Sequence, residues 1–341
     1  ILNFWYSMDN HFSCEDAMRN KRTPFEITNT MITDVVEIAE LVGRLTSTER
    51  LSSNPALRRN NRIRTIYSSL AIEQNTLTLE QTTAVLNGKR VLAPPKDIAE
   101  VQNAYEIYEH MDALNPYSMD DLLTAHSVMM CGLLEEAGEF RSRPVGVVGQ
   151  DGQILHFGTL PQYVPDLMAE LLNWVRDCDI HMLIRSCVFH YEFELIHPFA
   201  DGNGRMGRLW HTLLLSKWNP IFAWLPVESI IHDRQKEYYA AINTSNDMAE
   251  STVFIEFMLS AIKTSLIETV DVSDEVMDQT AWRWKRIERF LSDHTYITNA
   301  DVREICQVSS ATANRILKNL VDTGSVMKVR KGRVWAYQLV K

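Results

Sequence analysis

Twelve contiguous residues, from His197 to Arg208, hold the side chains of this chain that are best suited to act together in chemistry. They read His-Pro-Phe-Ala-Asp-Gly-Asn-Gly-Arg-Met-Gly-Arg. Among the side chains of this stretch, His197 is the one that titrates close to neutral pH, so it suits the role of a general base. Asp201 offers hard carboxylate oxygens, which Mg²⁺ prefers when it is shared with phosphate. The stretch therefore combines a proton acceptor with a metal ligand.

The same stretch has the features of an anion site. Gly202 and Gly204 let successive backbone N–H groups point toward one spot, and a helix expected to begin near Arg205 adds its positive end there. Arg205 and Arg208 are three residues apart, so they share one face of that helix. A lone His-Pro is typical of a helix end, and a lone Gly-x-Gly of a turn. The combination indicates a polyphosphate site, because two guanidinium groups lie beside a backbone nest.

At these residues the chain resembles the Fic family, whose signature is His-x-Phe-x-Asp/Glu-Gly-Asn-Gly-Arg-x-x-Arg. Every fixed position of the signature is matched between His197 and Arg208. The resemblance implies a mainly helical fold and the transfer of AMP from ATP to a hydroxyl side chain of a target protein. It also implies that His197 takes the proton of that hydroxyl and that Asp201 holds Mg²⁺.

The resemblance further assigns the nucleotide contacts. The glycine loop would hold the α- and β-phosphates, the first arginine would steady the phosphates, and the second would bind the γ-phosphate. A tyrosine pair in a later predicted helix would line the nucleotide pocket, although core packing explains that pair nearly as well. In chain order these residues are Gly202, Asn203, Gly204, Arg205, Arg208 and Tyr239, the last from the pair Tyr238-Tyr239.

A second segment bears on the same site. Residues 61–75 are expected to form a helix in which Ser69 and Glu73, four apart, share one face. Many Fic proteins carry an inhibitory helix with the pattern Ser/Thr-x-x-x-Glu-Gly/Asn. The match is at Ser69 and Glu73, and the departure is Gln74, where Gly or Asn is usual. The resemblance implies that Glu73 pairs with Arg208 and so removes the partner of the γ-phosphate.

Two alternatives to this role of Glu73 remain open. Most glutamates lie on the surface, and Glu73 at a solvated helix end would be one of them. In some relatives of the Fic family the same glutamate helps to orient the water that removes AMP from a modified target. The sequence does not exclude that second activity.

Residues 141–160 predict a β-hairpin. Two β-rich runs, 145–148 and 154–157, flank Asp151-Gly152, which is a hairpin turn signal. In Fic proteins such a hairpin is the flap that registers the target segment. Strand addition to its exposed edge would provide that contact. The alternative is a hairpin with a purely structural role.

The C-terminal residues 280–341 have a different organisation. Two predicted helices, 299–306 and 309–321, precede a predicted hairpin over 326–339 that is rich in Lys and Arg. This order resembles a winged helix-turn-helix domain. Such a module binds DNA through basic residues or serves as a protein-docking or dimer module, and both remain open.

Composition limits the protein class. The chain has 341 residues, of which 45% are hydrophobic and 23% charged, as in ordinary globular proteins. No apolar run approaches the length of a membrane span. The five cysteines lack metal-ligand or redox spacing, so reduced thiols in a cytoplasmic protein are expected. The net charge is −10, but the residues from Gln279 onward carry +7 and those before them −17. This asymmetry suggests different partners for the two parts.

These observations predict a mainly α fold, a Fic-type helical bundle with a β-hairpin flap and a C-terminal winged helix-turn-helix. The expected domains are an N-terminal helical region with the inhibitory helix, a catalytic core, an acidic linker and the winged helix. Their expected ranges are 1–95, 96–270, 271–279 and 280–341.

The function expected from the resemblance is that of an autoinhibited, Mg²⁺- and ATP-dependent protein adenylyltransferase. Its partner would be a target protein whose Ser, Thr or Tyr hydroxyl docks at the 141–160 flap, and homodimer formation is a further expectation. One alternative uses the same site with another nucleotide donor, or for AMP removal. Another is a DNA-binding regulator whose Fic site senses nucleotide or modifies itself.

Overall fold

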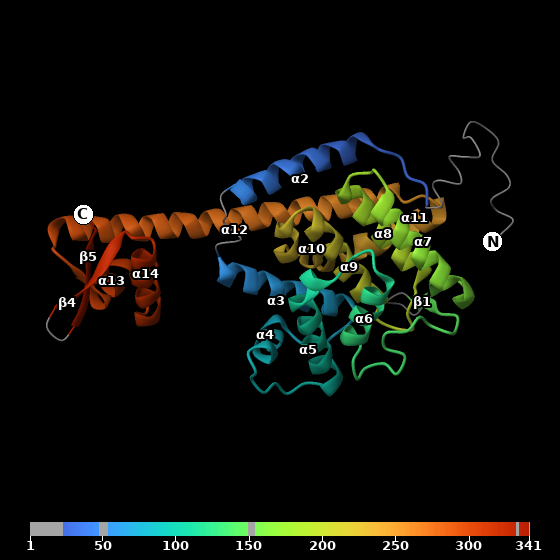
Figure 1. Cartoon of the computed structure of the whole chain (residues 1–341), viewed down its shortest axis with the longest axis horizontal. Helices are drawn as coiled ribbons and strands as arrows, with labels where there is room; N and C mark the ends of the chain where they lie inside the picture. The colour runs from blue at the N-terminus through green and yellow to red at the C-terminus, as the bar shows by residue number, and fades with distance from the viewer. Residues whose placement is uncertain (1–22, 48–53, 149–153, 332–333, 341) are drawn as a thin grey trace. The chain divides into compact units, whose positions relative to one another are not determined.

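The structure is a computed structural model that describes residues 23–47, 54–148, 154–331 and 334–340 (Figure 1). The chain divides into two compact units, Ile1–Thr269 and Val270–Lys341. Each unit has its own cluster of buried hydrophobic side chains. The prediction of a mainly α fold is confirmed. Within the described residues, no helix is both long enough and apolar enough to cross a membrane.

The first unit is built from helices and one two-stranded sheet. Its α-helices are α2 (Asn29–Ser47), α3 (Pro55–Ile72), α4 (Leu79–Leu86), α5 (Pro95–Glu109), α6 (Met119–Met129), α7 (Val164–Asp177), α8 (Met182–Ile196), α9 (Asn203–Trp218), α10 (Val227–Asp233), α11 (Gln235–Met248) and the beginning of α12 (Thr252–Asp293). Within the described residues, three short 3₁₀ segments lie between them, η2 (Met111–Ala113), η3 (Pro161–Tyr163) and η4 (Pro220–Trp224).

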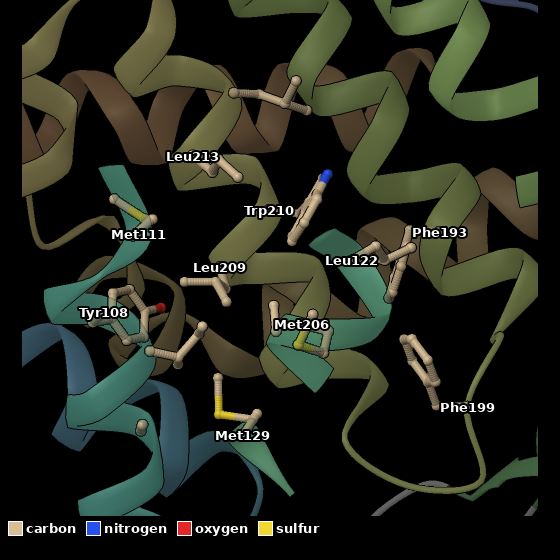
Figure 2. Packing of buried hydrophobic residues seen from close by; sticks show 14 of the residues in the cluster. Tyr108, Met111, Leu122, Met129, Phe193, Phe199, Met206, Leu209, Trp210 and Leu213 are labelled. Atoms are coloured by element: carbon tan, nitrogen blue, oxygen red, sulfur yellow. The ribbon is translucent and has the colours of Figure 1, made fainter. Parts of the chain in front are cut away.

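Helices α8 and α9 form the centre of this unit. Both are buried along most of their length. The sequence of α8 is apolar on nearly every side, whereas α9 also buries polar side chains, among them Arg205 and Arg208. Figure 2 shows Met206 and Trp210 of α9 among side chains that come from α5, α6 and α8. The indole N–H of Trp210 donates to the carbonyl oxygen of Pro116, so its one polar group is satisfied. The loop between the two helices, residues 197–202, is therefore anchored to the core at both ends.

Helix α3 ends differently from the prediction for residues 61–75. It begins at Pro55 and stops at Ile72, with Glu73 as its C-cap. Gln74 has a left-handed φ of 66°, and two backbone bonds close the end as a Schellman motif. The N–H of Gln74 donates to Ala71 O (3.0 Å), and the N–H of Asn75 donates to Leu70 O (3.1 Å). This geometry explains the usual Gly or Asn at position 74, because those residues adopt positive φ most readily.

The predicted hairpin is present. Strands β1 (Gly146–Val148) and β2 (Ile154–Phe157) pair antiparallel, with Gly146 opposite Phe157 and Val147 opposite His156. The N–H of Gly158 donates to Val145 O at 3.0 Å, which extends the pairing beyond β2. The Asp151-Gly152 turn itself lies outside the described residues.

The predicted linker over 271–279 is wrong as a break in secondary structure. Helix α12 runs from Thr252 to Asp293 and includes the whole segment. The segment contains neither Gly nor Pro, the residues that most often end a helix. Its acidic composition was therefore a poor sign of a linker, because polar residues without a helix breaker can continue a helix.

The second unit combines the end of α12 with two short helices and three strands. These are β3 (Ile297–Thr298), α13 (Asn299–Cys306), α14 (Ser310–Asp322), β4 (Val326–Lys331) and β5 (Val334–Leu339). The antiparallel sheet has the order β3-β5-β4. Its core contains Ile287, Ile297, Val302, Leu317 and Val326. The two helices followed by a hairpin match the predicted elements, and the winged helix-turn-helix assignment stays a prediction.

Replacement of Gln74 by glycine is expected to stabilise the first unit. A residue with a Cβ atom costs about 1–2 kcal/mol in the left-handed conformation, and glycine avoids this cost. Glycine also loses more backbone entropy on folding, so the net gain in stability is smaller. We expect the melting temperature to rise by about 2 °C in differential scanning calorimetry. Gln74→Ala is the matched control, because it keeps the Cβ atom and should not raise the melting temperature. An equal rise in both variants would contradict the role of the backbone conformation.

Candidate functional site

The loop between α8 and α9 is held by its own side chains. His197 ends α8 in a left-handed conformation (φ 53°, ψ 63°), where its N–H still donates to Phe193 O at 2.9 Å. The side chain of Asn203 bonds both polar backbone atoms of Phe199, each at 2.8 Å. The side-chain amide of Asn203 therefore holds the loop in place, and only its backbone N–H is left to bind an anion. A non-glycine residue at positive φ costs energy, so these two hydrogen bonds also help to keep His197 in its strained conformation.

The N-terminus of α9 faces the loop. Gly202 is the N-cap with φ 83°, and the first N–H that bonds within the helix is that of Met206, to Gly202 O. The preceding N–H groups, those of Asn203, Gly204 and Arg205, belong to the set that a helix leaves without intrahelical partners. They and the helix dipole favour a negative charge at this end.

A carboxylate of the protein lies at that end. Glu73 Oε1 accepts from Arg208 Nη2 at 2.7 Å, and a Cβ atom added at Gly204 would overlap Oε1. Ser69 accepts from the same guanidinium twice, through Oγ from Nε (3.1 Å) and through its carbonyl oxygen from Nη2 (3.0 Å). Glu73 therefore takes the anion position between the start of α9 and Arg208. The two predicted inhibitory residues are brought together with the predicted γ-phosphate ligand.

Arg208 is a buried cation, with 2% of its surface exposed. Burial, the largest single effect, lowers the pKa of Arg208. The charge and the hydrogen bond of Glu73, together with the charges of Tyr238 and Glu194, outweigh burial, so the pKa is raised. The side chain is therefore cationic at any physiological pH. Loss of one partner of a buried pair leaves an uncompensated charge and is strongly unfavourable. Arg208 consequently requires an anion, and the carboxylate can leave at low cost only if another anion replaces it.

His197 is arranged to be a neutral imidazole. Burial, the largest effect, lowers its pKa below the ordinary value, and the charge of Arg141 lowers it further. The backbone and the charge of Glu194 oppose this shift without reversing it. Because its pKa lies below the usual histidine value of about 6.5, the ring stays unprotonated down to a lower pH than an ordinary histidine does. At neutral pH it can accept a proton, as a general base must.

A cavity of about 280 Å³ joins these groups. Glu73, His197, Gly204 and Arg208 line it. Helix α11 adds Tyr238, Tyr239, Ile242, Asn243 and Asn246 to the lining, and Gly146 of the hairpin also reaches it. The structure thus places Tyr239 at the cavity as the sequence predicted, whereas its contact with a nucleotide stays a prediction.

Asp201 and Arg205 do not line this cavity. Asp201 is about half exposed, and its Oδ1 accepts from Gly202 N (2.6 Å) and from Arg205 Nη2 (3.1 Å). Arg205 is buried and also donates to Glu100 Oε1 at 3.1 Å. Arg205 is therefore placed to orient the Asp201 carboxylate. Its predicted phosphate contact stays a prediction.

The site offers few ligands for a metal ion. The described residues contain no group of three or more His, Cys, Asp or Glu side chains arranged to hold a metal ion. Asp201 is one exposed carboxylate at the edge of the loop. Mg²⁺ usually keeps several waters and is held by one or two carboxylates with substrate phosphates. The residues fit a metal ion that arrives with a nucleotide better than one bound by protein ligands alone.

His126 is fully buried and contacts the loop. Its ring stacks on Phe199 with 3.7 Å between centroids. Nδ1 accepts from the N–H of Gly138 (2.9 Å), so Nε2 carries the proton and donates to Asp201 O (3.0 Å). Burial lowers the pKa of His126, which agrees with a neutral ring. Its role is to hold the Asp201 backbone in place.

Arg141 is the residue that sequence reasoning missed. It is buried, and its guanidinium donates to backbone carbonyl oxygens on both sides of the site. These are His197 O from Nε (2.6 Å), Ile196 O from Nη2 (3.2 Å), Arg143 O from Nη1 (2.9 Å) and Thr159 O from Nη2. Its own N–H donates to Pro198 O at 3.0 Å. One side chain thus ties the end of α8 to the base of the hairpin. Backbone carbonyls belong to every residue, so no spacing in the sequence marks them as partners.

Replacement of Arg141 by alanine is expected to loosen the loop and the hairpin together. It leaves several buried carbonyl oxygens without donors, at about 1–3 kcal/mol each. We expect a loss of at least about 3 kcal/mol in unfolding free energy and faster hydrogen exchange in β1 and β2. Arg143→Ala is the matched control, because the exposed Arg143 side chain has no such contacts among the described residues. Hydrogen exchange in the hairpin that is unchanged in Arg141→Ala would contradict this role.

Comparison with known proteins agrees with this geometry. The sequence model of the Fic/DOC family matches residues 116–215. A crystal structure of a Fic family protein from Desulfovibrio desulfuricans G20 is 42% identical, with a TM-score of 0.72. That match covers 94% of this chain and 98% of the Desulfovibrio chain.

The matching relatives include proteins whose names state a function. The protein adenylyltransferase fic-1 of Caenorhabditis briggsae is 30% identical over 216 residues, 59% of this chain and 40% of that protein. The protein adenylyltransferase Fic of Drosophila mojavensis is 29% identical over 288 residues, 80% of this chain and 52% of that protein. The chain thus spans about half the length of these relatives or less. The extent and identity of the Desulfovibrio match, together with the motif loop inside the matched segment, show that the chain belongs to the Fic/DOC family.

Proposed function

We propose that the chain is a protein adenylyltransferase, which transfers AMP from ATP to a hydroxyl side chain of a target protein and is held inactive by Glu73. The observation that carries the proposal is the contact of the Glu73 carboxylate with Arg208 at the start of α9. This contact lies in the cavity that His197 also lines. An internal carboxylate at an anion site beside a neutral histidine is the arrangement expected of a blocked phosphate site. The names of the relatives support the same reaction class.

The proposed reaction assigns a role to each group. The neutral His197 accepts the proton of the target hydroxyl while the oxygen of that hydroxyl attacks the α-phosphorus of ATP. The new oxygen–phosphorus bond forms as the bond to the β-phosphate breaks, and pyrophosphate leaves. Mg²⁺, held by Asp201 with phosphate oxygens, would supply charge neutralisation on the leaving group. Such a transfer depends on positioning and charge stabilisation, which the N-terminus of α9 and Arg208 are placed to provide.

Two assignments are revised within this proposal. Arg205 acts on Asp201, because its guanidinium lies between that carboxylate and Glu100. Asn203 acts on the loop through its side chain and on phosphate through its backbone N–H. Both remain part of the site, but as groups that orient others.

The proposed inhibition by Glu73, called the brake below, follows from charge. The γ-phosphate of ATP would need Arg208, which is already bonded to Glu73 and Ser69. The negative carboxylate also repels a polyphosphate from the same helix end. ATP can therefore enter only in a pose unsuited to transfer, unless Glu73 leaves. The hairpin, which reaches the cavity at Gly146, is the proposed docking edge for the target segment.

Label transfer from ATP marked at the α-phosphate, with Mg²⁺ and a cell lysate, tests this function. We expect Glu73→Gly to raise the labelling of protein by about tenfold or more, which corresponds to about 1.4 kcal/mol in the barrier. Glu73→Gln should raise it as well, because it removes the charge but keeps the size of the side chain. His197→Ala in the Glu73→Gly background should abolish it.

The control is Glu40→Gln, which removes one exposed carboxylate on α2 and should leave labelling unchanged. ATP marked only at the γ-phosphate should transfer no label. Labelling that is equal in wild type and Glu73→Gly would contradict the brake. The absence of labelling in every variant would contradict the transfer of AMP and favour another donor or AMP removal.

A second function, contact with nucleic acid, is favoured by one surface of the second unit. The exposed Trp335 ring lies under Lys328 Nζ (4.3 Å) and the Arg330 guanidinium (5.8 Å), and Lys331 Nζ lies over Tyr296 (4.2 Å). These residues combine cations with aromatic faces along β4, β5 and the residue that precedes β3. Such a surface suits a phosphate backbone.

Fluorescence anisotropy with a labelled DNA duplex tests this contact. Wild type should bind with an affinity that falls steeply as salt rises, and Lys328→Gln should weaken binding and lower the salt slope by about one. Lys89→Gln, which removes one exposed cation from the first unit, is the charge-matched control and should change neither. Binding that does not depend on salt, or no binding, would contradict the contact.

A further inference from the structure

A second cavity, of about 220 Å³, lies at the opposite end of the helix that carries Glu73. The beginning of α3 supplies three arginines to it, helix α5 supplies a tyrosine and a glutamate, and η4 supplies a tryptophan. The lining side chains that matter here are Arg58, Arg59, Arg62, Tyr105, Glu109 and Trp224. Three guanidinium groups thus face one carboxylate. The cavity has an excess of positive charge although the chain as a whole is acidic.

Two of the guanidinium groups each have one buried N–H without a hydrogen-bond acceptor among the described residues. The Nε atoms of Arg58 and Arg62 are buried without a hydrogen-bond partner among the described residues. Arg62 is 4% exposed, and its Nε lies 3.6 Å from Glu109 Oε1, which is beyond hydrogen-bond distance. Burial lowers the pKa of Arg62, which reflects the cost of keeping this cation away from water. Buried donors are rarely left unpaired, so these two indicate an acceptor that the protein itself does not provide.

The surroundings hold the arginines in place. The Arg58 and Arg62 guanidinium carbons lie 5.1 and 4.6 Å from the centre of the Trp224 ring, and that of Arg62 lies 5.2 Å from the Tyr108 ring. Arg59 donates to Asn87 Oδ1 at 2.9 Å. Stacking on aromatic rings restricts a guanidinium group, so less conformational entropy is lost when it binds an anion.

The start of α3 adds to the positive potential. Pro55 occupies the first helical position, and Asn54 Oδ1 accepts from the N–H of Leu57 at 3.1 Å. The helix has 18 residues, and its dipole is positive at this end. A fork of donors, a helix N-terminus and an aromatic wall are the features by which proteins bind phosphate groups.

We propose that this cavity binds a phosphate group, either of free pyrophosphate or of a nucleotide, and that its occupation secures α3. The other end of the same helix, about 27 Å away at 1.5 Å per residue, carries Ser69 and Glu73. An anion that bridges Arg58 and Arg62 fixes the two guanidinium groups that stack on Trp224 of η4 and on Tyr108 of α5, and so strengthens the contact of the start of α3 with these elements. A ligand that binds the docked helix better than a displaced one shifts the equilibrium toward the docked state. The consequence for activity, a stronger brake, rests on the proposed function, whereas the site does not.

Calorimetric titration of the full chain with pyrophosphate tests the site. The test variant is Arg58→Gln/Arg59→Gln, which leaves the buried Arg62 intact. Arg64→Gln is the matched control, because Arg64 is half-exposed on the same helix and pairs with Glu268 away from the cavity. Arg208→Gln reports binding at the first cavity. We expect wild type, Arg64→Gln and Arg208→Gln to bind alike, and the double variant to bind at least about tenfold more weakly.

Three results would overturn the site: no binding to wild type, equal affinity in the double variant, or loss of binding in Arg208→Gln. The last would place the ligand at the start of α9. AMP is the second probe. Tighter binding of AMP would assign the phosphate to a nucleotide, tighter binding of pyrophosphate would assign it to a free polyphosphate, and both support the site.

Hydrogen exchange tests the coupling without any assay of activity. Saturating pyrophosphate should slow amide exchange at least about threefold along α3, including the Leu70–Glu73 end, in wild type and in Arg208→Gln. The double variant should show no such protection. Binding without protection at the Glu73 end would overturn the coupling, and it would do so whether or not the chain transfers AMP.

Discussion

The arrangement of the first unit depends on one buried cation that must have an anion. Arg208 lies on α9 at the centre of the core, and Glu73 and Ser69 satisfy it from α3. The carboxylate also meets the N-terminus of α9 against Gly204. A buried guanidinium cannot be left alone without a large cost, so the carboxylate can leave only when another anion takes its place. This exclusivity can turn a structural ion pair into a switch.

The scaffold makes that place rigid. Both helices that flank the loop are buried, so the loop cannot shift without disturbing the core. Asn203, His126 and Arg141 bond its backbone from three directions. Together they maintain the left-handed backbone of His197, a conformation that persists only where its surroundings impose it. The neutral state of His197 has the same origin, because burial lowers its pKa.

Particular elements show how far sequence reasoning reached. The helices flanking the motif and the hairpin were predictable, because apolar runs and an Asp-Gly turn are local signals. The limits of α3 were not, because its end depends on a Schellman motif with a glutamine in the left-handed position. The linker within α12 was predicted from acidic composition, which does not break a helix. The contact of Arg205 with Glu100 was not predictable either, because it joins side chains that are 105 positions apart.

The sequence by itself determined the residues of the loop, since the base, the carboxylate, the glycines and the arginines are contiguous and their chemistry follows from their types. Through the resemblance to the Fic family, it also pointed to Glu73 as the partner of Arg208, although the two residues are 135 positions apart. Only the tertiary structure decided what each side chain contacts. Arg141 bonds backbone carbonyls, and the arginines at the start of α3 surround a cavity whose other walls come from α5 and η4. Such partners have no side-chain signature or fixed spacing, so packing alone brings them together.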